Sequence, residues 1–492
     1  MIFLFIALPL FTAALLPLIG KLSRRVVPDL VGNGVLLFLL VYAVVAGRSL
    51  IDAGPVVQQL SWLGESVNIR LVLDGFSLFM LVTISLLGLA VGLFSIDYME
   101  HYGAKGTYYA LLLVMIVGMN GLVLTADLFN IYLFLEVGAI SSYALVAYGL
   151  GHDELEAAFK YLMLSVVASA FILISIAILF GTTGDLSLGG IARGLKVLDN
   201  PGLVAICAAL FIAGFGLKAA LIPFHAWLPD AHPSAPAPIS AMLSGLLIKV
   251  SGVYALTRVF FNVFGLTPAL SMVLLVLGTV SMVGAAFLAL GQKDIKRMLA
   301  YSSISQVGYI VVGLGTGSPL GIAGALFHLV NHALAKGLLF LNSGAIQSAT
   351  GTRNLDEMGG LAKRMPLTAA TNLVGSLSIA GVPPLGGFWS KLIIIMALVQ
   401  AGRWPYAVVA VLASVLTLWY YLLIQRKAFF GKLEERWAGI REAPAWMTAA
   451  SLALALLCVA LGLFFAGVLQ SWIQPAADVL ARGASAVLTW GR

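Results

Sequence analysis

One stretch of the chain brings together the residue types best suited to chemistry inside a membrane. Between Lys218 and Lys249 the sequence holds two histidines, one aspartate and five prolines, and both lysines lie in apolar segments. A lysine near the bilayer centre costs about 2.5–3.5 kcal/mol on insertion scales, and a broken helix frees backbone groups that lipid cannot satisfy. Such features persist where they face a protein interior or a water-filled cavity. The stretch therefore predicts a role in moving ions or protons.

Two further lysines lie in apolar segments towards the C-terminus. His328, His332 and Lys336 are spaced by four residues, so they share one face of a helix and form a polar stripe that could pass protons. A metal site at the two histidines is the alternative, but the sequence offers no further carboxylate or thiol ligand nearby. Lys391 follows a Gly/Pro-rich break and begins a half-helix.

Glu136 is the one carboxylate that falls well inside a predicted span. It needs a partner of opposite charge, and we predict Lys218 for that role. A Glu–Lys pair in a low-dielectric environment keeps both groups charged, whereas separating the two lets the lysine release its proton. A row of amines that sense one another's charge could then move protons laterally through the membrane.

His225, His232 and Asp230 lie near the predicted cytoplasmic end of the seventh span. They could form a site of proton uptake. They could equally be solvated loop residues, and the sequence leaves both interpretations open.

The composition places the chain in the membrane class. Of the 492 residues 61% are hydrophobic and only 10% are charged, whereas a soluble protein carries roughly 25% charged residues. The net charge of +7 does not indicate nucleic-acid binding, because the basic residues lie in short loops between apolar spans and form no continuous basic face. Cys207 and Cys458 both lie in apolar spans and are interpreted as packing residues.

The apolar segments predict an all-α polytopic membrane protein with about 14 transmembrane helices, each long enough for a hydrocarbon core of about 30 Å. The predicted spans are 1–20, 28–48, 72–96, 107–125, 127–149, 158–181, 202–228, 236–261, 269–290, 296–316, 318–345, 366–401, 405–425 and 447–471. The seventh and twelfth are interrupted by proline, at Pro223 and at Pro383-Pro384.

The two interrupted spans are five spans apart, and each pairs a proline break with two aromatic residues and a nearby lysine. Because an odd number of spans reverses the orientation, this pattern predicts two inverted five-helix repeats, the usual context of a transport site. The predicted division is 1–106 for helices 1–3, 107–261 for the first repeat, 269–430 for the second repeat, and 431–492 for helix 14 with a short tail.

The distribution of basic residues predicts an N-terminus outside the cell. Lys21, Arg24 and Arg25 follow the first apolar run, which is the wrong order for a cleaved signal peptide. With this orientation, loops on the cytoplasmic side carry about twice as many basic residues as outer loops, as the positive-inside rule requires. Arg258 is assigned to the outer side, so no arginine is expected inside the membrane, where lysines take the place of permanent cations. This matters because a desolvated lysine can lose its proton, whereas arginine effectively cannot.

Five motifs carry a resemblance to a known family. They are DLFNIYLFLEVGAISSYAL, LKAALIPFHAWLPDAHPSAPAPISAMLSGLLIKVSGVYAL, KDIKRMLAYSSISQVGYI, HLVNHALAKGLLFLNSGAI and GVPPLGGFWSKL. Over roughly residues 70–430 the chain resembles the antiporter-like subunits shared by Mrp-type Na⁺/H⁺ antiporters and the membrane arm of respiratory complex I. Within this family it is most similar to D-type Mrp subunits, and next to subunits of membrane-bound hydrogenases.

The resemblance implies 14 helices, inverted repeats with broken helices 7 and 12, and a central axis of charged residues. The family's pattern falls on Glu136, Lys218, Lys249, Lys336 and Lys391. It also implies membrane partner subunits, since Mrp complexes are hetero-oligomers and a single such subunit is not expected to transport. The short tail disfavours the L-type subunit of complex I and the A subunit of Mrp complexes, which have long C-terminal extensions. Lysine at 391 disfavours the M-type subunits of complex I, which carry glutamate there. D-type Mrp, hydrogenase-type and N-type subunits remain.

Three functions follow as hypotheses. The first is a proton-translocating subunit of a multisubunit Na⁺/H⁺ antiporter in a bacterial or archaeal cell membrane. The second is a proton-pumping subunit of a redox-driven complex, and the third is a structural scaffold, which the buried lysines argue against. The chain has neither a nucleotide fingerprint nor a cysteine cluster, so we expect no cofactor in it and any redox chemistry in its partners.

Overall fold

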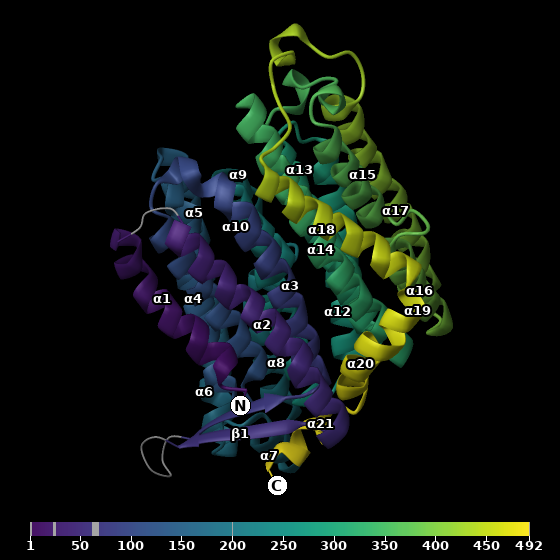
Figure 1. The fold of residues 1–492 in the computed structure, drawn as a ribbon. Helices are drawn as coiled ribbons and strands as arrows, with labels where there is room; N and C mark the ends of the chain where they lie inside the picture. Colours follow the sequence, from purple (N-terminus) through teal and green to yellow (C-terminus); the bar gives the residue numbers. More distant parts are fainter. Residues whose placement is uncertain (1, 23–25, 62–67, 199, 492) are drawn as a thin grey trace.

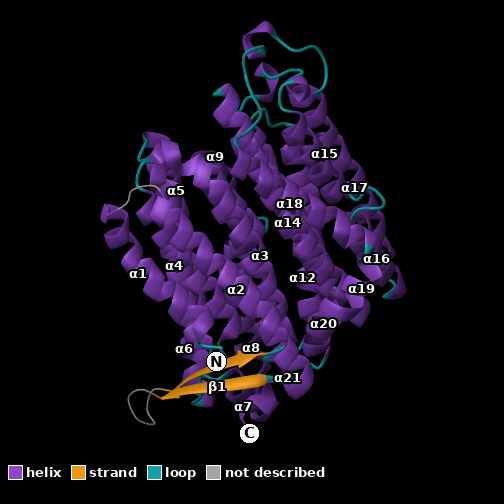
Figure 2. Ribbon diagram, in the orientation of Figure 1, coloured by secondary structure: helices purple, strands orange, loops and turns teal. Residues whose placement is uncertain are grey.

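A computed structural model describes the chain except for residues 1, 23–25, 62–67, 199 and 492, so the predicted cytoplasmic residues Arg24 and Arg25 lie outside the described part. Helices make up nearly all of it, and the only strands among the described residues form one antiparallel hairpin (Figure 2). This confirms the predicted all-α polytopic class. The ends of the described chain lie at the same end of the molecule, next to the hairpin (Figure 1).

The N-terminal part contains three long helices and the hairpin. Its elements are α1 (Leu4–Leu22), α2 (Val26–Ala53), β1 (Val56–Ser61), β2 (Asn68–Leu73) and α3 (Gly75–Tyr98). The hairpin lies in the region between the second and third predicted spans and was not predicted from the sequence.

The middle part of the chain contains the first broken helix. Its elements are α4 (Lys105–Leu124), α5 (Leu128–Val146), α6 (His152–Thr183), α7 (Leu188–Val197), α8 (Pro201–Lys218), α9 (Leu228–Ser234), α10 (Ala237–Met242), the π-helix η3 (Leu243–Tyr254) and α11 (Ala255–Asn262). Three of these, α10, η3 and α11, run on without interruption as one membrane-length helix.

The second half of the chain contains the second broken helix and a C-terminal group, while the division into two inverted repeats stays a prediction. Its elements are α12 (Pro268–Leu290), α13 (Ile295–Gly315), α14 (Pro319–Thr350), α15 (Pro366–Ala380), α16 (Gly386–Gln400), α17 (Trp404–Ile424), α18 (Ala445–Leu463), α19 (Phe465–Val468), α20 (Gln474–Ala481) and α21 (Ala484–Leu488). Short 3-10 or π turns occur at Met99–Tyr102, Ala147–Gly149, Leu355–Glu357, Leu361–Lys363, Gln425–Phe429, Glu435–Trp437, Leu469–Ile473 and Thr489–Gly491.

The described residues contain 13 helices that are long and apolar enough to cross a membrane, compared with about 14 predicted. The difference arises at the twelfth predicted span, which is divided into α15 and the short apolar helix α16. The break between them was predicted: Gly381, with φ of +88°, ends α15, and the chain resumes its helix at Gly386. Glycine suits this position because it adopts a positive φ at little cost.

Two helices form the centre of the bundle. The apolar windows of the helix Ala237–Asn262 and of α14 are entirely buried, whereas those of α1 and α2 are only about one-third buried. A helix that is apolar on all sides belongs in such an interior. The central pair also carries Lys249, His328, His332 and Lys336, so the fold places the candidate residues far from lipid.

The structure corrects the assignment of Arg258 to the outer loops. This arginine lies in α11, is 2% exposed, and its Nη1 lies 2.9 Å from Oδ2 of Asp74, the N-cap residue of α3. The prediction that no arginine is buried with the spans was therefore wrong. A buried guanidinium is tolerated here because it is paired and hydrogen-bonded.

Candidate functional site

The predicted pair of Glu136 and Lys218 is confirmed as a direct contact. Glu136 lies in the middle of α5, Lys218 is the last residue of α8, and their Oε1 and Nζ atoms are 3.3 Å apart. Two serines of α6 complete the site, because Ser169 donates a hydrogen bond to Glu136 and Lys218 donates one to Ser165. Lys218 is buried, but 22% of the Glu136 side chain is exposed. The pair therefore joins the surface of α5 to the interior.

The sequence places the break in the seventh span at Pro223, but the helix already ends at Lys218. Ala220 has a φ of +55°, which ends the helix before the proline is reached. The Lys218 ammonium consequently lies at a helix C-terminus, where the helix dipole favours a cation. The segment beyond is held in place by the Trp227 Nε1–H, which donates to the Leu217 carbonyl at 3.0 Å.

Lys249 lies in the π-helix η3 and is fully buried. Its ammonium donates to the Ser244 carbonyl, with an Nζ–O distance of 2.5 Å. The hydroxyl of Ser244 in turn contacts that of Ser303 on α13 at 2.6 Å. A π-helical stretch is rare and often marks a functional site. The sequence predicted a plain helix here, because no residue pattern distinguishes π from α geometry.

The histidines and Lys336 share one face of α14, as predicted. The His328 and His332 rings are stacked with centroids 6.3 Å apart. His328 is held by Ser390 and Gln306 at 2.9 and 3.2 Å, whereas neither ring nitrogen of the buried His332 has a hydrogen-bond partner among the described residues. Lys336 donates to the Leu299 carbonyl at 2.9 Å.

Lys391 lies in α16, just beyond the second break. Its Nζ lies 3.4 Å from the Ala380 carbonyl, at the end of α15, and 4.6 Å from the centre of the Tyr309 ring. This carbonyl belongs to the last turn of α15, where the intrahelical partners are missing. The break thus supplies a carbonyl partner and an aromatic face to a buried ammonium.

Electrostatic interactions connect the residues of the second half to Lys249. Lys249 interacts with Lys336, and His332 interacts with both of these lysines, with His328 and with Lys391. Lys218 interacts instead with Glu136. The structure therefore brings the predicted residues together as one pair and one cluster of amines and histidines.

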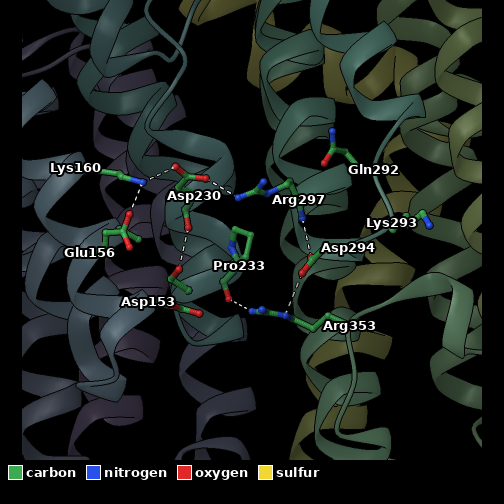
Figure 3. Close-up of a pocket in the computed structure, with 12 residues that line it drawn as sticks. Asp153, Glu156, Lys160, Asp230, Pro233, Gln292, Lys293, Asp294, Arg297 and Arg353 are labelled. Carbon is green, nitrogen blue, oxygen red and sulfur yellow. Dashed lines mark hydrogen bonds and ion pairs between the residues drawn. The ribbon is translucent and has the colours of Figure 1, made fainter.

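Asp230, His225 and His232 have three different surroundings. Asp230 lies 2.6 Å from Arg297 and 3.5 Å from Lys160, in a surface pocket of about 430 Å³ formed by the beginnings of α6 and α13 and by α9 (Figure 3). His225 is half-buried in the break. His232 is completely buried against the Phe340 ring, with centroids 4.4 Å apart, so the interpretation as a solvated loop residue is wrong for it.

Sequence reasoning missed several buried charges. Lys105 and Lys296 are among the basic residues that the sequence places in cytoplasmic loops, but both are buried. Lys105 pairs with Asp29 at 2.7 Å, and Lys296 donates to the Ala235 carbonyl. Both lie at the beginning of a helix, and no residue pattern indicated that neighbouring helices cover these ends. A capping pattern was available for Asp74, which accepts a hydrogen bond from the Ser77 amide three residues later.

No group of three or more His, Cys, Asp or Glu side chains is placed to hold a metal ion in the part of the chain that the structure describes. The chemistry that the arrangement offers is proton exchange among amines, imidazoles and one carboxylate.

Comparison with known proteins relates this arrangement to a family. Residues 125–417 match the family described as "NADH:quinone oxidoreductase/Mrp antiporter, TM", and residues 62–109 match the one described as "NADH-Ubiquinone oxidoreductase (complex I), chain 5 N-terminus".

Similar proteins cover nearly the whole chain. The N subunit of the NADH-quinone oxidoreductase of Desulforudis audaxviator is 35% identical over 96% of this chain and 97% of its own length. The D subunit of the Na⁺/H⁺ antiporter of Alkalihalophilus pseudofirmus is 34% identical over 87% of this chain and 86% of its own length. A chain of the Mrp complex from Dietzia sp. DQ12-45-1b superposes with a TM-score of 0.91 at 31% identity and covers 99% of both chains.

Proposed function

Because this chain belongs to the NADH:quinone oxidoreductase/Mrp antiporter family, we propose that it is the proton-translocating subunit of a multisubunit Na⁺/H⁺ antiporter. The observation that carries the proposal is a set of buried lysines on separate elements, Lys218, Lys249, Lys336 and Lys391, the first of which is paired with the carboxylate of Glu136. Stability of the fold does not explain why these lysines are buried. Apolar residues would pack in the same positions without the cost of desolvating a charge, and a buried ion pair rarely adds stability.

Glu136 is the residue that controls the charge of Lys218. While the two are in contact, the carboxylate stabilises the ammonium. If a cation approaches Glu136 or the pair separates, the uncompensated ammonium releases its proton into a low-dielectric environment. Each partner forms a hydrogen bond with one serine of α6, and these bonds hold the two side chains in contact.

The proton continues through the cluster of amines and imidazoles. Lys249 and Lys336 repel each other when both are charged, so gaining a proton at one favours loss at the other. His332 and His328 link these lysines to Lys391 by their electrostatic interactions. A neutral imidazole both donates and accepts a proton, which suits a relay.

Protons reach this cluster from the face that carries Asp230. Asp230 lies in the charged surface pocket, and His232, two residues further along α9, is buried against Phe340. His225 lies in the break between Lys218 and α9. With the N-terminus outside, this face is cytoplasmic, and the host is a bacterial or archaeal cell membrane.

Partner membrane subunits complete the transporter. Glu136 is the one carboxylate that lies well inside a predicted span, away from its ends, and one carboxylate is too few for a Na⁺ site. The proposal therefore assigns protons to this chain and the metal cation to a partner, and the chain itself acts as part of a transporter and not as an enzyme.

The experiment uses the assembled complex in inverted membrane vesicles with an imposed proton gradient and a pH-sensitive dye. Adding Na⁺ should release protons in wild type and in the exposed loop variant Lys432→Ala, but not in Lys218→Ala. Normal proton movement in an assembled Lys218→Ala complex would contradict the proposal.

A second candidate is a proton-pumping N-type or hydrogenase-type subunit of a redox-driven complex. The full-length similarity to the N subunit of an NADH-quinone oxidoreductase favours it. In the same vesicles, no response to Na⁺ together with proton movement on adding NADH or a reduced electron donor would select this function.

A further inference from the structure

An aromatic stack ties the segment beyond the first break to α6, the helix that carries the two serines of the ion pair. Trp227 is the residue at which α9 begins, and its ring lies flat against the ring of Tyr161 on α6. The two ring centres are 4.1 Å apart and the planes differ by 8°. Both side chains are buried. Such a pair favours one relative geometry, so the stack fixes the start of α9 against α6.

Trp227 extends this fixed position back across the break to Lys218. Its indole N–H donates to the carbonyl of Leu217 at 3.0 Å, and Leu217 directly precedes Lys218, the last residue of α8. A carbonyl in the last turn of a helix lacks the amide partner that a further turn would provide. The indole supplies a donor there, so the position of Trp227 bears directly on the turn from which the lysine projects.

Tyr161 is in turn held by α5, the helix that carries Glu136. The hydroxyl of Ser142 donates to the hydroxyl of Tyr161 at 3.1 Å. The ring of Tyr143 stands edge-on to that of Tyr161, with centroids 4.6 Å apart and planes at 88°. Both contacts come from α5. Tyr161 therefore touches the helix of the carboxylate as well as the segment that follows the amine.

One face of α6 contacts every part of this arrangement. Tyr161, Ser165 and Ser169 are spaced by four residues and so lie on one side of the helix. Ser165 accepts a hydrogen bond from Lys218, and Ser169 donates one to Glu136. The same face thus meets the carboxylate, the amine and the chain beyond the break.

We propose that Tyr161 is a positioning residue for the pair of Glu136 and Lys218, and that it acts through Trp227. The inference rests on the proposed function, in which contact between the two charged groups controls the proton of the lysine. Tyr161 itself exchanges no proton. Its ring holds Trp227, the indole N–H holds the last turn of α8, and Lys218 stays within reach of the carboxylate. Loosening the stack lets the pair separate more often.

Core packing alone is the alternative explanation for a buried aromatic pair. It predicts that replacing Tyr161 lowers stability without any particular effect on the charge of Glu136. A matched stack is available on α8 itself, where the rings of Phe211 and Phe215 lie 5.4 Å apart with planes at 6°. Phe211 lies about two turns before Lys218 on the same helix. Phe211→Leu is therefore the control for the loss of a buried stacked ring.

The test is infrared difference spectroscopy of the whole complex at one fixed pH. The absorption of a protonated carboxyl is assigned to Glu136 by its loss in Glu136→Gln. Tyr161→Leu should raise the ratio of protonated to ionised Glu136 about two- to tenfold, the range by which an aromatic pair shifts an equilibrium. The reason is that a carboxylate takes up a proton more readily when its ammonium partner moves away. Tyr161→Phe, which keeps the stacked ring, and Phe211→Leu should both give the wild-type ratio.

Transport is measured on the same variants in the vesicle assay. Tyr161→Leu should lower Na⁺-triggered proton release by a similar factor, and Tyr161→Phe should restore it. If Tyr161→Leu fails to assemble, Trp227→Phe takes its place, because it keeps a ring against Tyr161 but lacks the N–H that holds the Leu217 carbonyl. Its infrared signal should rise in the same way, and an unchanged signal overturns the inference.

The outcomes separate this inference from the proposed function. A wild-type infrared signal in an assembled Tyr161→Leu complex, or an equal rise in Phe211→Leu, overturns the role of Tyr161 and leaves the proposed function standing. Lys218→Ala gives the signal of the fully unpaired carboxylate. A wild-type signal in that variant would show that the lysine does not hold Glu136 ionised, which would contradict both the inference and the proposed function.

Discussion

At the level of single residues, one substitution can distinguish two roles of Lys218 in its contact with Glu136. Lys218 acts either as a fixed positive charge or as a group that takes up and releases a proton. Lys218→Arg keeps the positive charge next to Glu136 but cannot release a proton under physiological conditions. We expect the variant to assemble and to lose proton movement roughly 100-fold, which is within the range that proton-transfer groups contribute. The measurement is the Na⁺-triggered dye response in vesicles with matched amounts of complex. A Lys218→Arg complex that transports normally would show that Lys218 serves only as a fixed charge.

A substitution of His332 is expected to affect transport without lowering the stability of the protein. Its buried ring nitrogens have no hydrogen-bond partner in the part of the chain that the structure describes, and an unsatisfied buried polar group costs about 1–3 kcal/mol. We therefore expect His332→Leu to keep or raise the thermal unfolding midpoint in detergent while it reduces transport.

The neighbouring histidine is the matched control. His328→Leu removes the contacts to Ser390 and Gln306 and should lower the midpoint. A stable His332→Leu complex with full transport would exclude His332 from the proton path.

At the level of elements, the close approach of η3 to the first break depends on Gly252. A Cβ at this position would lie 2.4 Å from the Ala219 backbone nitrogen, so the helix or the break would have to move. Gly252→Ala should lower stability by roughly 1–3 kcal/mol, as overpacking does, and displace Lys218 from Glu136. Gly34→Ala, which meets nothing within 4 Å, is the control for a glycine in a membrane helix. An unchanged thermal midpoint in Gly252→Ala would refute this close approach.

The ion pair of Asp74 and Arg258 fastens the beginning of α3 to α11. Burial raises the Asp74 pKa, but the Arg258 guanidinium and the hydrogen bonds from Arg258 and Ser77 outweigh this and lower it overall. Asp74→Asn should reduce the free energy of unfolding by about 3–5 kcal/mol, because it leaves a buried guanidinium without a counter-charge. Asp153→Asn, at an exposed carboxylate, should have little effect.

The same pair predicts how stability depends on pH. Since the folded-state pKa of Asp74 is lowered, its contribution is present above the unfolded value of about 3.9 and is lost as the pH falls through the folded value. The difference in unfolding free energy between wild type and Asp74→Asn should therefore shrink only in strong acid. A constant difference down to that range would argue against the ion pair.

The sequence identified those elements whose apolar pattern is strong. The spans, the presence of two interrupted helices, the His328–His332–Lys336 face and the Glu136–Lys218 pair followed from spacing and charge, whereas the exact start of the first break did not. The burial of Lys105, Lys296 and Arg258 did not follow, because it depends on which helices meet at their ends. The π geometry around Lys249 and the short hairpin between α2 and α3 also lacked any signal in the residue pattern.

At the level of the whole molecule, Glu136 stands out because part of its side chain is exposed among apolar neighbours. Leu133 and Ile140 on the same helix are 43% and 63% exposed, so this face of α5 meets lipid unless another chain covers it. A charged group in lipid is costly, and a partner subunit would remove that cost.

A membrane-permeant carbodiimide tests this directly. It should modify Glu136 rapidly in the isolated chain and at least about tenfold more slowly in the assembled complex, because burial excludes the reagent. Mass spectrometry of the labelled peptide gives the rate, and Glu136→Gln is the control for labelling elsewhere. Equal rates in both states would show that no partner covers this face of α5.

The π-helix η3 also sets the rotational phase of everything that follows it in the same span. A residue in an α-helix advances about 100° around the axis, so one residue more or fewer between two side chains turns one relative to the other by that angle. Lys249 faces the cluster from within η3, and Arg258 faces Asp74 from the α-helix just beyond. A residue in a π-helix advances by a smaller angle, so winding the same residues, Leu243–Tyr254, as an α-helix would rotate Arg258 relative to Lys249 and turn it away from its carboxylate. The wider winding of η3 is thus what lets one continuous helix serve the proton cluster at its middle and an anchoring ion pair at its end.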